Sequence, residues 1–263
     1  MTTSSLEFIG TATTLLRLGP FVVLTDPNFL HRGQRAYLGK GLWTRRLTEP
    51  SRQAADLPDV DLVVLSHLHG DHFDRVARAE LRREVPVVST PAAARRLRRW
   101  GFAGAAGMAT WESTAMSAEG HRLTITAVPG QHARGLARSA LPPVMGSVLE
   151  LARPQRPPLR IYVSGDTLYY PWLSSIVERT GPLDAAVVHL GGTRVLGMLV
   201  TMDDRQGADL VELLNPSVVV PVHYDDYGVF KSPLTDFVTT VEQRRLRGAL
   251  RVVARGGTVS LDP

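Results

Sequence analysis

The chain has 263 residues, enough to bury a sizeable core in one large domain or two small ones. Hydrophobic residues make up 44% of it and charged residues 21%, as in ordinary globular proteins, and the lack of cysteine excludes disulfides and thiolate metal ligands. The net charge of +5 comes largely from arginine clusters at 95–99 and 244–247. Because no aromatic residues interleave these clusters, they favour solvated helix faces, or attraction of anionic substrates, over a nucleic-acid interface.

The N-terminal residues lack the basic stretch and apolar core of a signal peptide, and no apolar run approaches the length needed to cross a bilayer. We therefore expect a cytoplasmic protein without a membrane span. The proline-rich stretch 153–158 predicts a turn rather than a linker, because strand signals resume directly after it. We expect a single domain over residues 1–263.

The beginning of the chain predicts three short antiparallel strands, at 6–9, 13–18 and 21–25, because short apolar runs alternate there with turns. Residues 28–56 follow as a long, basic and poorly periodic loop. Loops of this length in a compact domain are usually functional or disordered, and the aromatic residues of this one favour a functional role.

Strands and helices alternate through the rest of the chain. Strands are predicted at 61–65, 85–89, 121–128, 148–151, 161–163, 185–188, 218–222 and 250–253, and helices at 73–83, 92–100, 170–179, 201–214 and 234–246. Thr201 and Asp204 have the spacing of a capping box at the start of one helix, and an insert at 133–143 is placed to fold over a site. In each half of the chain, predicted strands are followed by predicted helices, which indicates an α/β sandwich of two sheets flanked by helices.

The most informative stretch is His67-Leu-His-Gly-Asp-His72, which places four metal-type ligands directly after an apolar strand. His132, Asp166 and His223 each follow a later predicted strand, so the seven side chains should converge where strand ends meet at one sheet edge. Competing interpretations are a histidine satisfied at a strand end for His132 and a helix cap for Asp166. His189 also ends a strand, and it is either a proton donor or substrate contact, or a buried histidine bonded within the core.

These motifs resemble the metallo-β-lactamase fold superfamily, and the resemblance covers essentially the whole chain. Gly10-Thr-Ala-Thr-Thr14 and Leu24-Thr-Asp-Pro27 are further matches, similar to the branch of ascorbate-6-phosphate lactonases and phospholipase D-like acylethanolamine phosphodiesterases. The resemblance implies a four-layered αββα sandwich of two mixed β-sheets flanked by helices.

The resemblance also implies a dinuclear metal centre. His67, His69 and His132 would hold one ion, Asp71, His72 and His223 the other, and Asp166 would bridge both. Three neutral imidazoles leave an open position on the first ion, and two carboxylates lower the net charge of a pair of cations about 3.5–4 Å apart. Mixed nitrogen and oxygen ligands suit zinc, manganese and iron alike, and Zn²⁺ is the metal we expect, with Mn²⁺ and iron as alternatives. Asp26 is expected either to support the histidine loop as a hydrogen-bond acceptor or to be a simple turn residue.

The expected activity is that of a binuclear hydrolase, in which a hydroxide bridging two metal ions cleaves an ester, lactone or phosphodiester bond of an anionic small molecule. Catalytic roles are expected for Asp71, Asp166 and His189, and substrate contacts for Arg134, Arg138, His189 and Tyr224. The alternatives are a metal-dependent nuclease, which the basic charge suggests, and a non-catalytic binding protein stabilised by metal. The sequence is compatible with a homo-oligomer and with a monomer alike.

Overall fold

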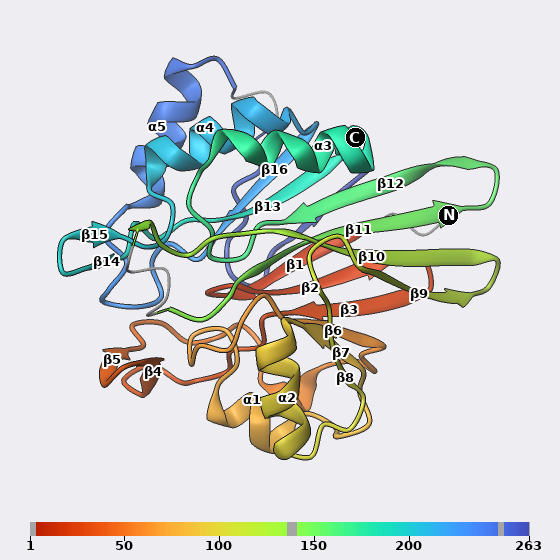
Figure 1. Cartoon of the computed structure of the whole chain (residues 1–263), viewed down its shortest axis with the longest axis horizontal. Helices are drawn as coiled ribbons and strands as arrows, with labels where there is room; N and C mark the ends of the chain where they lie inside the picture. Colours follow the sequence, from red (N-terminus) through yellow and green to blue (C-terminus); the bar gives the residue numbers. More distant parts are fainter. Residues whose placement is uncertain (1–3, 136–140, 247–249, 263) are drawn as a thin grey trace.

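The computed structural model describes residues 4–135, 141–246 and 250–262. Two β-sheets pack face to face, and helices cover the outer face of each, which gives the four layers visible in Figure 1. This confirms the predicted α/β architecture of two mixed sheets flanked by helices. Within the described residues, the longest helix has 11 residues, too few to cross a membrane, and no candidate span is found.

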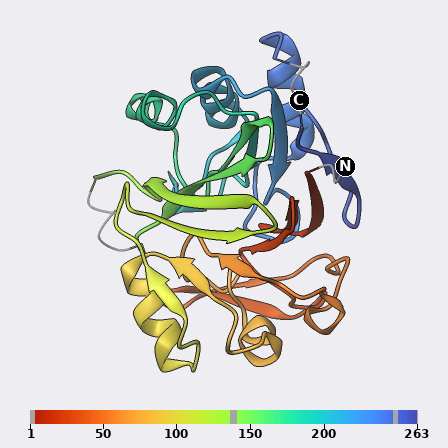
Figure 2. The ribbon, with the colours of Figure 1, turned by 90° about the vertical axis from the view of Figure 1, so that its right-hand side faces the viewer.

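The first sheet has seven strands in the order β17-β1-β2-β3-β6-β7-β8. Tight turns join β1 to β3, so these strands are antiparallel, whereas helical crossovers join β6 to β8 and make that half parallel. The strands are β1 (Ser5–Gly10), β2 (Thr13–Leu18), β3 (Phe21–Thr25), β6 (Leu62–Val64), β7 (Val87–Ser89), β8 (Ala105–Gly107) and β17 (Thr258–Ser260). Figure 2 shows the two ends of the chain side by side, as the pairing of β1 with β17 requires.

The second sheet has six strands in the order β16-β13-β12-β11-β10-β9, antiparallel from β9 to β12 and parallel from β12 to β16. Its strands are β9 (Ser113–Ala118), β10 (His121–Pro129), β11 (Met145–Arg153), β12 (Arg156–Val163), β13 (Ala185–His189) and β16 (Val218–Val222). The parallel strands β13 and β16 are apolar and fully buried, as expected for strands covered on both faces.

The hydrophobic core has two parts, a main core and a smaller core next to α1 and α2. The helices are α1 (Arg75–Glu80) and α2 (Pro91–Arg99) over the first sheet, and α3 (Ser175–Thr180), α4 (Asp204–Leu214) and α5 (Leu234–Gln243) over the second, with short 3₁₀ turns η1 (Ala54–Asp56) and η3 (Pro171–Ser174). On β2, Leu16 belongs to the main core, which includes the space between the sheets, while Leu15 packs into the smaller core with residues of α1 and α2. Adjacent residues serve both cores because their side chains leave a strand on opposite faces.

Two hairpins lie at one side of the sandwich, on the left in Figure 1. The expectation of an irregular loop over 28–56 is wrong, because β4 (Arg35–Gly39) and β5 (Leu42–Arg45) form an antiparallel hairpin inside it. Its turn carries Gly39, Lys40 and Gly41 in left-handed backbone conformations, which a periodicity search does not register. A second, unpredicted hairpin joins β14 (Arg194–Val195) to β15 (Met198–Leu199).

Other boundaries also differ from the sequence-based expectation. The prediction of a strand over 250–253 is wrong, because Leu250 makes an isolated bridge to Val219 and the last strand of the described residues is β17. Asp203, not Thr201, caps α4, because its carboxylate accepts the N–H of Gln206. Helix 73–83 is shortened to α1, which Asp74 caps, and the short strands β8 and β9 were not predicted.

Candidate metal centre

The sheet edges bring together the ligand-type residues predicted from the sequence. His67 follows β6, His132 follows β10, Asp166 follows β12 and His223 follows β16, so four strands deliver side chains to one place. The hydrophobic sequences of these strands fix their burial, and the polar residues then emerge in the loops beyond their ends. Side chains of three groups of described residues come close enough to share an ion: His67, His69 and His132; Asp71, His72, Asp166 and His223; and Asp26, His72 and His189. The first two groups contain all seven ligand-type residues predicted from the sequence, and the third shares His72 with the second.

The first group consists of three buried imidazoles. The Nε2 atom of His67 lies 2.9 Å from Nδ1 of His69, and Nδ1 of His132 bonds to the carbonyl oxygen of Val200, which leaves its Nε2 atom facing the group. Burial, reinforced by the neighbouring imidazoles, lowers the pKa of His67 well below its ordinary value and that of His69 to about 4. Both rings are therefore neutral near pH 7, the form that binds a metal ion.

The second group adds two carboxylates. Nε2 of His223 lies 3.4 Å from Oδ2 of Asp71, and Nε2 of His72 lies 3.2 Å from Oδ2 of Asp166. Burial would lower the pKa of His72, but the carboxylates of Asp166 and Asp26 outweigh it and raise that pKa well above its ordinary value. The carboxylates thus create a field that favours positive charge at this point.

The unsatisfied atoms of the second group show that it suits a cation. Asp71 Oδ1, His72 Nε2 and Asp166 Oδ1 are buried and have no hydrogen-bond partner among the described residues. Leaving a buried polar atom unpaired costs about 1–3 kcal/mol, and more when the group is charged. These nitrogen and oxygen atoms are of the type that Zn²⁺, Mn²⁺ or iron prefers, and coordinating an ion would remove this cost. The donor set therefore fits a divalent metal.

Asp26 supports the histidine loop from behind. Its Oδ1 atom accepts the backbone N–H of Ser66 at 2.7 Å, and its Oδ2 atom lies 3.3 Å from both Nδ1 of His72 and Nε2 of His189. Burial would raise the pKa of Asp26, but the charges of His72 and His189 and their hydrogen bonds lower it to about 2. This placement agrees with the supporting role rather than the simple turn residue. Asp26 also has a φ of 38°, a left-handed conformation held by these contacts.

His189 lies behind His72 rather than at the ligand cluster's open side. The two rings stack with centroids 5.9 Å apart, and both nitrogens of His189 have partners, Ser164 Oγ at 3.2 Å and Asp26 Oδ2 at 3.3 Å. This geometry favours the buried, hydrogen-bonded histidine over the proton donor. The supporting residues Ser66 and Ser164 were not predicted, although Ser66 directly precedes the motif and Ser164 comes two residues before Asp166.

The backbone holds other parts of the site by close approach. His223 has a φ of 64°, its N–H donates to the carbonyl of Thr11 at 2.7 Å, and its Nδ1 atom bonds to the carbonyl of Leu190 at 2.8 Å. Gly70 leaves no room for a side chain, because a Cβ atom there would lie 2.7 Å from the backbone nitrogen and oxygen of Tyr37. The β4–β5 hairpin is therefore fixed against the histidine motif.

A family comparison matches most of the chain. Residues 22–224 match the model described as the β-lactamase superfamily domain. The chain belongs to the β-lactamase superfamily. The match includes every one of the seven ligand-type residues, while the narrower lactonase or phosphodiesterase branch stays a prediction.

Individual proteins also resemble the chain, with sequence identities below 30%. A metal-dependent hydrolase of Thermococcus onnurineus is 28% identical over 169 residues, which are 64% of this chain and 69% of that protein. The structure of isothiocyanate hydrolase from Delia radicum gut bacteria has a TM-score of 0.82 at 19% identity and covers 98% of this chain and 100% of that one. A possible metal-dependent hydrolase from Veillonella parvula has a TM-score of 0.83 at 20% identity, with the same coverage. At these identities the two structures support the fold.

In this superfamily member, a narrow cavity of about 40 Å³ lies over the candidate metal centre. His69, Asp71, His132 and Asp166 form its polar end. Its walls are mainly apolar and come from both hairpins and neighbouring loops: Leu38, Leu42, Leu141, Val195, Val200 and Val229. Thr193 also lines it, and its Oγ1 atom is buried without a hydrogen-bond partner among the described residues.

Two of the residues expected to contact substrate, Arg134 and Tyr224, make their contacts away from this cavity. Arg134 is exposed, donates to the carbonyl of Tyr169 at 3.2 Å and lies over the ring of Tyr170. Tyr224 packs against Phe8 in the core, with ring centroids 6.0 Å apart. Neither residue lines the cavity, and Arg138 lies outside the described residues. Among the described residues, no arginine or lysine lines this cavity.

Proposed function

We propose that the chain, a metal-dependent hydrolase, binds two divalent metal ions, most readily Zn²⁺, and cleaves an ester, lactone or phosphodiester bond of a small molecule. The observation that carries the proposal is the convergence of seven ligand-type side chains, three of which have buried unpaired ligand atoms. When bound, the ions would supply a hydroxide nucleophile and polarise the bond that is cleaved. His67, His69 and His132 would hold one ion, and Asp71, His72 and His223 the other.

The protein's own residues then orient the ligands and select the substrate. Asp26 holds the His72 ring through Nδ1, and the carbonyls of Val200 and Leu190 fix the rings of His132 and His223. The unpaired hydroxyl of Thr193 is placed to bond a polar atom of the substrate. The apolar walls exclude water from the reacting end and accept a hydrocarbon substituent next to the scissile bond.

The cavity also bears on the alternatives. Apolar walls and the lack of a basic lining residue in the described part of the chain favour a small molecule over a nucleic-acid strand as the substrate. A purely structural metal site needs neither an adjoining cavity nor an unpaired threonine hydroxyl inside it. Because no described arginine or lysine lines this cavity, the proposal does not include a further anionic group on the substrate beyond the bond that is cleaved.

The test is an assay of the metal-loaded protein against four substrates: p-nitrophenyl acetate, a δ-lactone, bis-p-nitrophenyl phosphate and, because of the structurally similar isothiocyanate hydrolase, benzyl isothiocyanate. We expect turnover of at least one. His69→Ala should lower kcat/KM by at least about 100-fold and retain cooperative unfolding, because His69 is a ligand rather than a core residue. His121→Ala is the control, because this partly exposed histidine begins β10 and His132 follows the opposite end of that strand.

Two outcomes would overturn the proposal. One is full metal occupancy without turnover of any substrate in the panel. The other is unchanged turnover in metal-stripped protein, which would exclude a catalytic role for the metal.

A further inference from the structure

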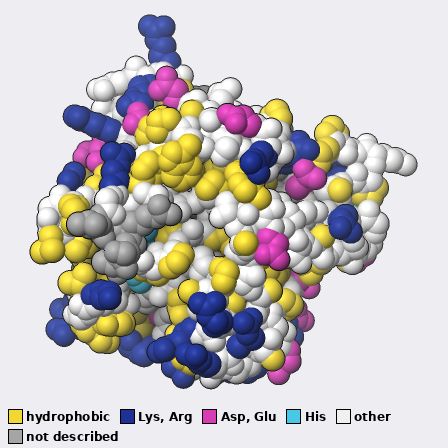
Figure 3. Space-filling model, viewed as in Figure 1, with side chains coloured by type: hydrophobic (Ala, Val, Ile, Leu, Met, Phe, Trp, Pro, Cys, Tyr) yellow, Lys and Arg dark blue, Asp and Glu magenta, His cyan; other side chains and the backbone are white. Residues whose placement is uncertain are grey.

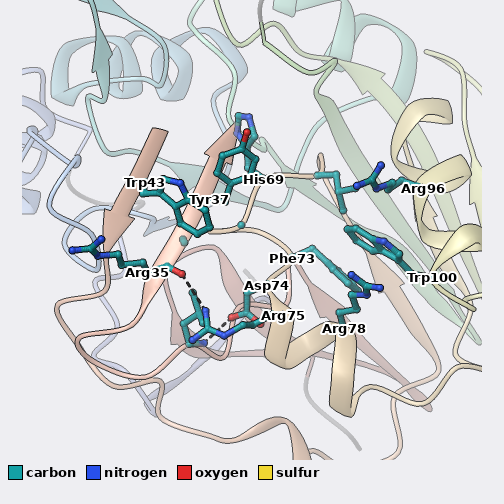
Figure 4. A pocket seen from close by; sticks show the side chains of 14 residues that line it. Arg35, Tyr37, Trp43, His69, Phe73, Asp74, Arg75, Arg78, Arg96 and Trp100 are labelled. Carbon is teal, nitrogen blue, oxygen red and sulfur yellow. Dashed lines mark hydrogen bonds between the residues drawn. The ribbon is translucent and has the colours of Figure 1, made fainter. Parts of the chain in front are cut away.

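A second concave surface of about 490 Å³ lies beside the metal centre (Figure 4). The β4–β5 hairpin forms one wall, and α1 and α2 form the other. We call it the arginine groove, defined by Tyr37, Trp43, Arg75, Arg78, Arg96 and Trp100. Its volume falls in the range of sites that bind small molecules, which is about 300–1,000 Å³. His69 lines both this groove and the cavity described above.

The groove carries positive charge that the described residues do not neutralise. Arg75, Arg78 and Arg96 are exposed, and none of them forms an ion pair with a described carboxylate. The single acidic residue in the lining is Asp74, whose oxygens accept backbone N–H groups of Phe29, Leu30 and Ala77. Figure 3 shows Lys and Arg side chains gathered over this part of the molecule. An anion in the groove would therefore meet guanidinium groups that no described carboxylate neutralises.

Trp100 holds two of these guanidinium groups in place. The Cζ atom of Arg78 lies 4.5 Å from the centroid of the Trp100 ring, and that of Arg96 lies 5.3 Å from it. Phe73 stacks on the same tryptophan with centroids 6.3 Å apart, which fixes the indole from the core side. A cation–π contact positions a guanidinium without cancelling its charge, so its N–H groups stay available to an anion.

The opposite wall offers exposed aromatic surface. The rings of Tyr37 and Trp43 lie 4.8 Å apart on the hairpin, and 45% of Tyr37 and 59% of Trp43 are exposed. Exposed aromatic side chains next to a concave surface commonly mark a binding site. On the same hairpin, Leu38 and Leu42 line the metal cavity instead, because strand alternation directs neighbouring residues to opposite faces.

We propose that the arginine groove binds a small aromatic anion, a planar ring that carries a sulfonate, carboxylate or phosphate group. The ring packs on Tyr37 and Trp43, and the anionic group accepts hydrogen bonds from Arg78 and Arg96 across the groove. Arg75 contributes charge from the α1 side, although its Nη1 atom also donates to the carbonyl of Arg35 at 3.1 Å. Arg35 also lines the groove from the hairpin side.

The test is isothermal titration calorimetry with three probes that separate ring from charge: naphthalene-1-sulfonate, 1-naphthalenemethanol and methanesulfonate. None of them contains a bond of the classes proposed for hydrolysis, so the result does not depend on activity. We expect one site for naphthalene-1-sulfonate and at least about ten-fold weaker binding of the other two, because each lacks one half of the interaction.

Adjacent arginines of α2 supply matched variants. Arg96→Gln should weaken naphthalene-1-sulfonate binding by about ten-fold, and Arg95→Gln, one residue away and outside the groove, should leave it unchanged. Both residues are exposed, so neither change threatens the fold. His132→Ala, which alters the metal centre but not the groove, should also leave binding unchanged.

Three results would overturn the proposal. Equal binding of methanesulfonate and naphthalene-1-sulfonate would indicate a non-specific anion site. Loss of binding in His132→Ala, with no effect of Arg96→Gln, would place the anion at the metal centre. Tight binding of polyuridylic acid or polyglutamate without binding of naphthalene-1-sulfonate would assign the groove to a macromolecule.

Discussion

The Oδ2 atom of Asp166 lies 3.2 Å from Nε2 of His72 and 3.9 Å from Nε2 of His132, so one carboxylate reaches both groups of ligands. Its other oxygen, Oδ1, lies 3.6 Å from Nδ1 of His223 and has no hydrogen-bond partner among the described residues. Burial would raise the pKa of Asp166, but His223 and His72 outweigh it and lower that pKa well below its ordinary value. A charged carboxylate at this position can hold two cations close together.

Asp166→Asn keeps the size of the side chain and removes its charge. We expect the metal content to fall from about two ions per chain to about one or fewer, because the shared negative ligand is lost. Activity should fall by more than about 100-fold, which is the upper end of the loss typical when a residue that only hydrogen-bonds to a metal ligand is replaced. Elemental analysis after dialysis measures the first effect. Asp59→Asn, at a side chain that is 94% exposed, is the control, and an unchanged metal content in Asp166→Asn would show that the carboxylate is not a ligand.

Asp26→Asn tests the support behind the histidine loop. Because Asp26 accepts hydrogen bonds from Ser66 and fixes the ring of His72, its replacement should weaken metal affinity by about 10–100-fold while the ligands themselves remain. Competition with a chelator of known affinity measures the change. A metal affinity equal to that of the wild type, in a variant that has lost stability, would show that Asp26 serves only the fold.

The cavity wall should control substrate size. Leu38→Ala removes part of an apolar wall contributed by the β4–β5 hairpin. We expect kcat/KM for a p-nitrophenyl ester with a longer acyl chain to rise relative to p-nitrophenyl acetate, by about 10-fold for one or two additional methylene groups. Leu47→Ala, at an exposed leucine outside the cavity, provides the comparison. Equal ratios in both variants would exclude the hairpin from substrate selection.

Arg46 and Asp226 form a buried pair that ties the hairpin to the loop after β16. Neither side chain is exposed, their atoms lie 3.3 Å apart, and Asp226 also accepts the N–H of Thr11 at 2.7 Å. Removing one partner of a buried pair typically costs about 3–5 kcal/mol, so Asp226→Asn should lower the free energy of unfolding by about that amount at pH 7. Asp225→Asn, at the half-exposed neighbour, should cost less than about 1 kcal/mol.

The same pair makes a prediction about pH. Burial would raise the pKa of Asp226, but Arg46 and Arg255 outweigh it and hold that pKa below the ordinary value of 3.8. A depressed pKa contributes stability that is present above 3.8 and is lost as the pH falls through the folded-state pKa. The difference in unfolding free energy between wild type and Asp226→Asn should therefore be constant from pH 7 to about pH 5 and shrink below pH 3.8. Urea unfolding at a series of pH values measures it; a difference that grows in acid would contradict the charged pair.

The sequence predicted the strands that position the site better than the segments around it. Buried strands such as β16 have strong apolar runs, and ligand-type residues directly after them converge for topological reasons. The β4–β5 hairpin was missed because its pattern is short and its turn depends on left-handed backbone at Lys40. The contacts of Tyr224 and Arg134 could not be predicted, since nearness in sequence to His223 or His132 does not determine which way a side chain points.

The most direct measurement is anomalous X-ray diffraction from crystals of the metal-loaded protein, recorded on both sides of the absorption edge of the bound metal. We predict two peaks, one among His67, His69 and His132 and the other among Asp71, His72 and His223, with Asp166 between them. A single peak, or two peaks with the Asp166 carboxylate turned away from both, in crystals of protein that is active in solution would contradict the binuclear account.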